Sequence, residues 1–267
     1  MLVLRNKVFL FTRHGKVWIM SRVYLITGAS SEVGMTYIKK LDETVSESVI
    51  VISHYANNKS GLEVLQSELS HVTLHMVQAD LSLTEGAATI CNYIKENKLE
   101  VTHVLHLAAS AFSHMKIKKW NDDKVKKEMQ IQFFSFAFIM KEILPQMAKA
   151  GFGRVCVMLS SYVLGTPPKF MSDYVAIKSA LLGYVKAVAA EYGEKGICVN
   201  GISPNMMETK FLQNIDEKII QMTAESSALK RNIRVEETIS GIVYLLSDEA
   251  SYVNGTNLNL SGGDYMN

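Results

Sequence analysis

The chain has 267 residues, of which 48% are hydrophobic and 20% are charged, with a formal net charge of +2. This length suits one large domain that buries a core without staples. The small net charge gives no electrostatic reason to expect nucleic-acid binding. No apolar run is long enough to span a membrane, so no membrane association is expected.

The cysteines give a first indication of the environment. Cys91, Cys156 and Cys198 are odd in number and share no close spacing, so neither a disulfide framework nor a zinc site is indicated. Cys156 and Cys198 lie within apolar runs, where cysteine usually behaves as a small buried hydrophobe. We therefore predict a cytoplasmic protein with free thiols and no bound metal.

Residues 1–20 are apolar but interrupted by basic residues, and they lack a small-residue cleavage site. This pattern argues against a signal peptide. Met20 offers an alternative start, so two interpretations stay open: a native N-terminal extension, or an upstream segment that is not part of the natural protein. Residues 21–267 are expected to form a single domain.

From residue 22 onward, short β-branched runs alternate with longer helical patterns. Strands are expected at 22–28, 48–54, 72–80, 102–110, 153–161, 197–204 and 256–260. Helices are expected at 33–43, 59–69, 84–97, 121–150, 172–194 and 235–247. This order predicts an α/β fold: a doubly wound (Rossmann) parallel sheet of about seven strands with helices on both faces.

The first turn of this fold reads "TGASSEVG" (27–34). Small residues in a strand-to-helix turn expose backbone N–H groups, and the start of the helix favours a phosphate. The turn is therefore a candidate cofactor site, whose residues would be Gly28, Ser30, Ser31, Val33 and Gly34. A helix cap built from the two serines is the alternative.

The most specific signal is a tyrosine and a lysine four positions apart, Tyr174 and Lys178. Residues at this spacing lie on one face of a helix. Ser161 ends the preceding strand, 13 residues before Tyr174, and a strand end and the following helix can meet at a cleft. Together with the glycine turn, the pattern Ser…Tyr-x-x-x-Lys resembles the short-chain dehydrogenase/reductase family in its single-domain form.

The resemblance implies an oxidoreductase that transfers a hydride between NAD(P)(H) and a carbonyl or alcohol substrate. Tyr174 would be the general acid in reduction and the base in oxidation. A free tyrosine has a pKa of about 10, and a nearby lysine cation lowers it. Ser161 would hold the substrate oxygen, with Ser160 as its rival, and Lys178 would also contact the nicotinamide ribose.

Three positions depart from the family pattern. Glu32 replaces the middle glycine of the motif T-G-x-x-x-G-x-G; its carboxylate would either repel the cofactor phosphates or point away to cap the helix, and we expect the second. Gln132 stands where the family often has an asparagine of a proton relay, which makes it a fourth candidate catalytic residue. Pro204-Asn205 replaces Pro-Gly. His106, in "HLAA", is expected to be structural.

The remaining cofactor contacts are also implied by the resemblance. They are Asp80 and Leu81 beside the adenine ring, Ala108 and Ala109 next to the cofactor, Pro204 after the sixth strand, and Thr209 at the nicotinamide carboxamide.

The choice of cofactor is read at the end of the second strand, where an acidic residue selects NAD. The segment "ISHYANNK" (52–59) has none. His54, Tyr55 and Asn57 are candidates to accept a 2′-phosphate, with Lys59 nearby. NADP is therefore preferred over NAD.

Substrate and assembly are less clearly indicated. The Met-rich segment 205–228 fits either an adaptable apolar lid or a packing helix. The stretch "EMQIQFFSFAFIMKEIL" is apolar on more than one face, so we expect a homo-oligomer, a tetramer before a dimer. Two other functions stay open: a non-enzymatic cofactor-binding or regulatory protein, and a sugar-nucleotide epimerase, which the absence of a separate C-terminal domain disfavours.

Overall fold

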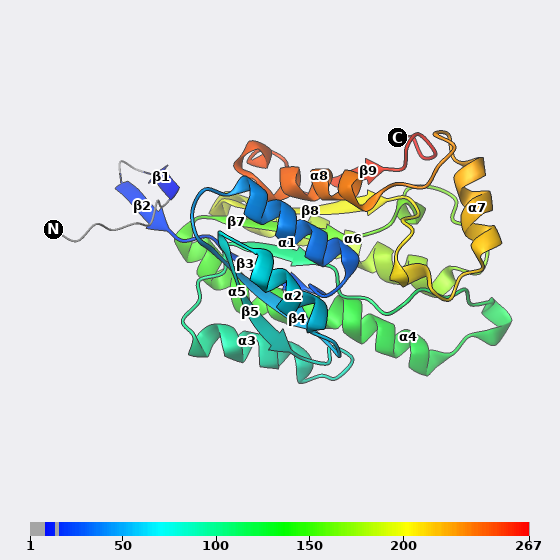
Figure 1. Cartoon of the computed structure of the whole chain (residues 1–267), viewed down its shortest axis with the longest axis horizontal. Coiled ribbons are helices and arrows are strands. Elements are labelled where there is room, and N and C mark those ends of the chain that lie inside the picture. The colour runs from blue at the N-terminus through cyan, green and yellow to red at the C-terminus, as the bar shows by residue number, and fades with distance from the viewer. Residues whose placement is uncertain (1–8, 14–15, 267) are drawn as a thin grey trace.

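The computed structural model describes residues 9–13 and 16–266. Its centre is a parallel sheet of seven strands in the order β5-β4-β3-β6-β7-β8-β9 (Figure 1). The strands are β3 (Val23–Thr27), β4 (Val49–Tyr55), β5 (Val72–Gln78), β6 (His103–His106), β7 (Gly153–Met158), β8 (Ile197–Pro204) and β9 (Asn257–Leu260).

Helices cover both faces of the sheet. They are α1 (Glu32–Thr44), α2 (Ser60–Glu68), α3 (Gly86–Glu96), α4 (Asp122–Met129), α5 (Ser135–Ala150), α6 (Ser172–Tyr192), α7 (Glu217–Ser226) and α8 (Val235–Leu246). Buried residues of α3, α5 and α6 form one core with the sheet, and those of α1, α2 and α8 form the other. The predicted doubly wound architecture is confirmed.

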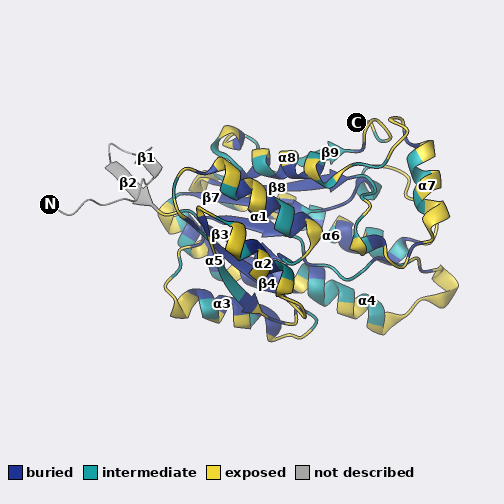
Figure 2. Cartoon of the chain, viewed as in Figure 1, coloured by how far each residue is buried: buried dark blue, intermediate teal, exposed yellow. Residues whose placement is uncertain are grey.

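The central strands are apolar because both of their faces are covered. All five residues of β3 and all eight of β8 are buried, which accounts for the continuous hydrophobic runs in the sequence. Figure 2 shows the buried residues concentrated in the sheet and on the inner faces of the helices.

The long helix expected at 121–150 is interrupted. A π-helical turn, Gln130–Phe134, separates α4 from α5 and carries the buried side chain of Gln132. Such turns in α-helices occur frequently at functional sites.

Two antiparallel strands pair near the N-terminus: β1 (Phe9–Arg13) and β2 (Lys16–Met20). Residues 1–8 of the expected extension lie outside the described part of the chain, and whether residues 1–20 are native stays a prediction. In the residues that the structure describes, no helix is long and apolar enough to cross a membrane.

The strand order fixes the position of the site. β3 pairs with β4 on one side and with β6 on the other. The strands β3 to β5 therefore extend the sheet in one direction and the strands from β6 onward extend it in the opposite direction, although all of them are parallel. In open α/β sheets, ligands bind beyond the carboxyl ends of the strands at this reversal.

Candidate active site

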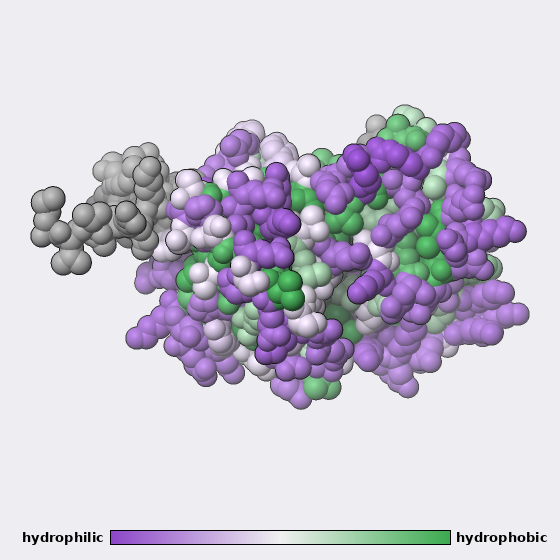
Figure 3. All heavy atoms as spheres, in the orientation of Figure 1, coloured by the Kyte–Doolittle hydropathy of each residue, from purple (hydrophilic) through white to green (hydrophobic). Residues whose placement is uncertain are grey.

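A cavity of about 760 Å³ opens at the predicted place. It is lined by the turn after β3, the ends of β4 and β5, the loop after β6, the end of β7, the start of α6 and the segment after β8. The predicted catalytic and cofactor residues line this cavity except Gly34 and Gln132, and of the residues offered for a 2′-phosphate Tyr55 and Lys59 do not line it. Figure 3 shows a hollow in the visible face, with hydrophobic residues in its depth and hydrophilic residues along much of its border.

The turn after β3 is shaped by its two glycines. Gly28 has a φ of +71°, and a Cβ there would lie 3.1 Å from the backbone nitrogen of Ala108. A Cβ on Gly34 would lie 2.5 Å from the carbonyl oxygen of Ala29, so Gly34 allows α1 to pack on the turn instead of lining the cavity. Both positions therefore require glycine for backbone reasons.

Ser31 caps α1, as the alternative interpretation of the turn expected. Its hydroxyl accepts from the Gly34 N–H at 3.1 Å and donates to the Gly28 carbonyl at 2.8 Å. The cap does not conflict with phosphate binding, because the N–H groups of Glu32 and Val33 in the first helical turn have no acceptor within the helix. The turn thus fits a cofactor diphosphate, with a cavity in front of it.

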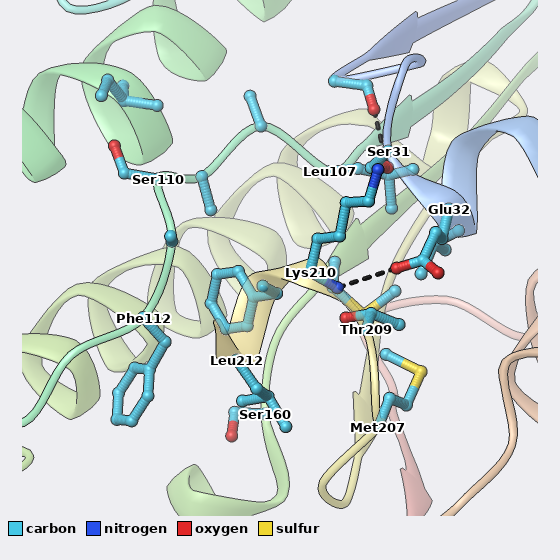
Figure 4. A pocket seen from close by; sticks show the side chains of 18 of the residues that line it. Ser31, Glu32, Leu107, Ser110, Phe112, Ser160, Met207, Thr209, Lys210 and Leu212 are labelled. Carbon is cyan, nitrogen blue, oxygen red and sulfur yellow. Dashed lines mark hydrogen bonds between the residues drawn. The ribbon is translucent and has the colours of Figure 1, made fainter. Parts of the chain in front are cut away.

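Glu32 does not cap α1. Its carboxylate accepts a hydrogen bond of 2.8 Å from the backbone N–H of Lys210, in the segment after β8. Figure 4 shows this bond joining the glycine turn to the short helix Lys210–Leu212. The expectation that this side chain points away to serve the helix was therefore wrong about its partner.

The residues at the end of β4 bear on the choice of cofactor. His54 lines the cavity, but its Nδ1 accepts from the Gly28 N–H at 3.0 Å and its Nε2 donates to the Ala79 carbonyl at 3.0 Å. Burial lowers the His54 pKa, so the imidazole is neutral and supports the turn after β3 through its hydrogen bond to Gly28. Tyr55 is buried in the core, and Lys59 pairs with Glu63 at 2.7 Å. Of the four candidates, Asn57 and His54 line the cavity, and Asn57 is exposed.

Both candidate serines, Ser160 and Ser161, line the cavity together with Tyr174 and Lys178. The Ser160 hydroxyl contributes to lowering the pKa of Tyr174, and it accepts a hydrogen bond from the Tyr162 N–H at 3.3 Å. The Ser161 hydroxyl donates instead to the side-chain oxygen of Asn205 at 3.3 Å. Spacing alone favoured Ser161; the short helix Ser161–Val163 that starts directly after Ser160 turns the two neighbouring hydroxyls in different directions.

Lys178 lies beside the tyrosine ring rather than at its hydroxyl. Its Nζ is 5.8 Å from the Tyr174 ring centroid and donates to the Met158 carbonyl at 2.8 Å. Burial lowers the pKa of Lys178 to about 8, while the charge of Glu128 raises it. Burial raises the pKa of Tyr174, and the Ser160 side chain lowers it. The Tyr174 pKa is thus raised by desolvation, the opposite of the lowering expected from the lysine.

His106 and Gln132 are linked behind the cavity. The His106 Nε2 donates to the Gln132 carbonyl at 2.8 Å, and its Nδ1 accepts from the Thr27 hydroxyl at 2.7 Å. Burial lowers the His106 pKa to about 3, which fits the structural role expected for it. The Gln132 side chain donates to Glu128 at 3.0 Å and lies outside the cavity lining, so its relay role stays a prediction.

Two phenylalanines form an aromatic wall around Tyr174. Phe211 belongs to the segment 205–228 that was expected as a possible lid, whereas Phe112 was not predicted. The Phe112 ring meets the Tyr174 ring edge-on at 4.9 Å, and Phe211 lies 6.0 Å from Phe112. The Phe112 N–H donates to the Phe211 carbonyl at 2.8 Å, which ties the loop after β6 to the segment after β8. No periodicity marks these loop residues in the sequence; only the flanking strand ends place them near the cleft.

The remaining predicted contacts lie where expected along the lining. Asp80 is exposed at the end of β5, where its hydrogen bonds with Ser82 lower its pKa. Leu81 and Ala108 are buried, and Ala109, Pro204 and Thr209 complete the lining. No group of three or more His, Cys, Asp or Glu residues able to hold a metal occurs among the described residues.

Comparison with known proteins agrees with this geometry. A family model described as enoyl-(acyl carrier protein) reductase matches residues 41–264. The chain is 28% identical over 249 residues to the 3-oxoacyl-[acyl-carrier-protein] reductase FabG of Buchnera aphidicola, covering 90% of this chain and 96% of that one. It is also 28% identical to an uncharacterized oxidoreductase, YmfI, of Bacillus subtilis, covering 91% and 99%.

Solved structures show the same fold. A 3-oxoacyl-[acyl-carrier protein] reductase of Brucella melitensis superposes with a TM-score of 0.81 at 22% identity, covering 92% of each chain. A second reductase of that organism, with bound NAD, gives 0.79 at 23% identity, covering 92% of each chain. With the family model matching most of the chain, the expected enzyme class is confirmed: the chain belongs to the short-chain dehydrogenase/reductase family of NAD(P)-dependent oxidoreductases.

Proposed function

We propose that this protein reduces a carbonyl compound with NAD(P)H, with Tyr174 as the proton donor. The observation that carries the proposal is the meeting of Ser160, Tyr174 and Lys178 in one cavity with the glycine turn. These groups come from the end of β7, the start of α6 and the end of β3, and only the fold brings them together.

The residues divide the work of a reduction. The cofactor, when bound, supplies the hydride to the carbonyl carbon. Ser160 donates a hydrogen bond to the carbonyl oxygen and holds it near the Tyr174 hydroxyl, which gives its proton to that oxygen. The raised pKa of Tyr174 keeps the phenol protonated, which suits a proton donor in the reductive direction. Lys178 adds positive charge beside the phenol, where negative charge develops.

The residue that holds the substrate oxygen is either Ser160 or Ser161. Ser161 was favoured by its spacing from Tyr174, but its hydroxyl is directed to Asn205. We therefore assign substrate holding to Ser160 and a positioning role to Ser161, which fixes the turn that presents Ser160.

The wall around Tyr174 bears on the substrate. Phe112, Phe211 and Leu212 line the cavity next to the phenol, and they pack with Met206 and Met171 into one apolar cluster. We infer a substrate whose carbonyl is flanked by apolar groups, such as an alkyl or cyclic ketone. An acyl chain with a 3-oxo group is one such substrate, and relatives of this chain are named 3-oxoacyl-[acyl-carrier-protein] reductases.

For the cofactor, NADP(H) is proposed over NAD(H). Ala56 and Asn57 line the cavity at the end of β4, and neither is the acid that would bind a ribose 2′-hydroxyl. Because His54 and Tyr55 are occupied elsewhere, Asn57 carries this choice. Substituting Asn57→Asp should weaken NADPH binding and leave NADH binding equal or tighter.

We also propose a homo-oligomer, a tetramer before a dimer, in the cytoplasm. The support is the apolar surface of the interrupted long helix, where Phe134 is 53% exposed, and the three free, buried cysteines of the described chain. Light scattering of the purified protein would show a monomer if this is wrong.

The test is a titration of the purified protein with NADPH and NADH, followed by a panel of ketones, 3-oxoacyl thioesters and enoyl thioesters. Tight binding with turnover of a carbonyl supports the proposal. Binding without turnover of any compound would favour a regulatory protein instead, an alternative that the departures at Glu32, Gln132 and Asn205 motivate. Failure to bind either nucleotide would reject both.

A further inference from the structure

One hydrogen bond joins the cofactor turn to the segment that covers the cavity. The Glu32 carboxylate accepts from the Lys210 N–H at 2.8 Å, across 178 residues of sequence. The next residue, Phe211, accepts from the Phe112 N–H at 2.8 Å. Consecutive residues of this segment are thus held from two sides of the cavity, by the turn after β3 and by the loop after β6.

The hydrogen bond between Glu32 and Lys210 brings a carboxylate and a lysine together at the turn after β3. A glutamate at the position of the middle glycine brings a carboxylate to the place where a cofactor diphosphate would bind, and like charges repel there. The same glutamate holds the backbone of a lysine. In Figure 4 the Lys210 side chain extends from the Lys210–Leu212 helix toward Ser31, back over the turn.

The other lysines that line the described cavity serve other places. Lys178 donates to the Met158 carbonyl beside Tyr174. Lys127 contributes to lowering the pKa of Asp80, which places its charge at the end of β5. Lys210 is the lining lysine whose backbone is fastened to the glycine turn.

We propose that Lys210 is a cofactor-binding residue whose ammonium contacts the diphosphate of NAD(P), and that Glu32 positions it. Glu32 and Lys210 then act as a unit: the carboxylate that replaces glycine brings its own compensating cation. The inference rests on the proposed cofactor binding, and it assigns to the segment after β8 a role in holding the diphosphate in addition to covering the substrate.

The test compares the dissociation constants of NADPH for single variants by nicotinamide fluorescence. Lys210→Ala should weaken binding about tenfold, as expected for one charge-assisted contact to phosphate, and Lys210→Arg should restore most of it. Lys218→Ala is the matched control, because Lys218 is exposed on α7 and outside the cavity lining. The dissociation constant of Lys210→Ala should also depend less on salt than that of the wild type.

A pair of variants at Glu32 separates positioning from repulsion. Glu32→Gln keeps an acceptor for the Lys210 N–H and should bind NADPH within a few-fold of the wild type, whereas Glu32→Ala loses the acceptor and should bind more weakly. Tighter binding by both variants would show that the carboxylate only repels and would overturn the proposal. Wild-type affinity in Lys210→Ala would overturn it too, while leaving NADPH binding itself intact. Absence of NADPH binding by the wild type would reject the proposed function and this inference together.

Discussion

The assignment of the catalytic serine gives the sharpest prediction. Replacing Ser160 by Ala removes the hydroxyl that lowers the pKa of Tyr174 and that we assign to the substrate oxygen. Removing one such donor from an active site lowers kcat by about 10²–10³, or about 3–4 kcal/mol of transition-state stabilisation. Ser161→Ala is the matched variant, since it removes a neighbouring buried hydroxyl whose partner is Asn205.

The two variants should differ in kind. Ser161→Ala loses one hydrogen bond of 3.3 Å, which costs about 1 kcal/mol of unfolding free energy and should change kcat by only a few-fold. Ser160→Ala should bind NADPH like the wild type, and the pH profile of alcohol oxidation should move to higher pH. This shift follows because the lost hydroxyl lowers the pKa of Tyr174, whose deprotonated form is the base in oxidation.

The assay is steady-state reduction of a carbonyl that the wild type turns over, with the nucleotide dissociation constant and the thermal unfolding midpoint measured for each variant. The reasoning is refuted if Ser161→Ala loses about 10² or more in kcat while Ser160→Ala remains close to the wild type. The spacing of 13 residues before Tyr174 would then identify the serine correctly, and the effect of Ser160 on the Tyr174 pKa would be incidental.

Three further predictions concern stability and binding. Lys178→Met should abolish most activity. It should also raise the unfolding free energy at neutral pH by up to about 3 kcal/mol, because burial lowers the Lys178 pKa to about 8 from 10.5. This gain in unfolding free energy, measured by denaturant unfolding, should shrink as pH rises from 8 toward 10.5. Asp42→Asn should destabilise the fold by about 1 kcal/mol, because the carboxylate accepts from the N–H groups of residues 70–72. The pKa of Asp42 is lowered in the folded state, so the difference from the wild type should vanish as pH falls through that pKa, and a pH-independent difference would contradict this account. Phe112→Ala should raise KM for an apolar ketone more than it lowers kcat, whereas an unchanged KM would place the substrate elsewhere.

Much of the fold could be predicted from the sequence because buried parallel strands leave a strong local signal. The run "ICVNGISP" was expected at 197–204, and β8 occupies those residues. The long helix after β6 was less predictable. Its π-helical turn at Gln130–Phe134 includes the Gln132 carbonyl that accepts from His106, and no residue type in that stretch marks the turn.

The site shows the same division. The glycine turn follows from its position after the first strand, and Tyr174 and Lys178 were identified by their motif spacing and the family resemblance; all three lie at one cavity. The directions of the side chains could not be predicted from the sequence. Ser160 and Ser161 are adjacent in sequence, and only the turn after β7 decides which faces Tyr174. The partner of Glu32 lies 178 residues away, and the commitment of both His54 nitrogens depends on two other loops.

The central claim is that the phenol of Tyr174 protonates a carbonyl while a nicotinamide cofactor reduces it. The most direct measurement is single-turnover oxidation of enzyme-bound NADPH by a ketone, compared between the wild type and Tyr174→Phe. We predict that the variant binds NADPH with nearly unchanged affinity and loses at least about 10² in the rate of the chemical step. A variant that oxidises NADPH at the wild-type rate would contradict the account, because the proton would then come from another group.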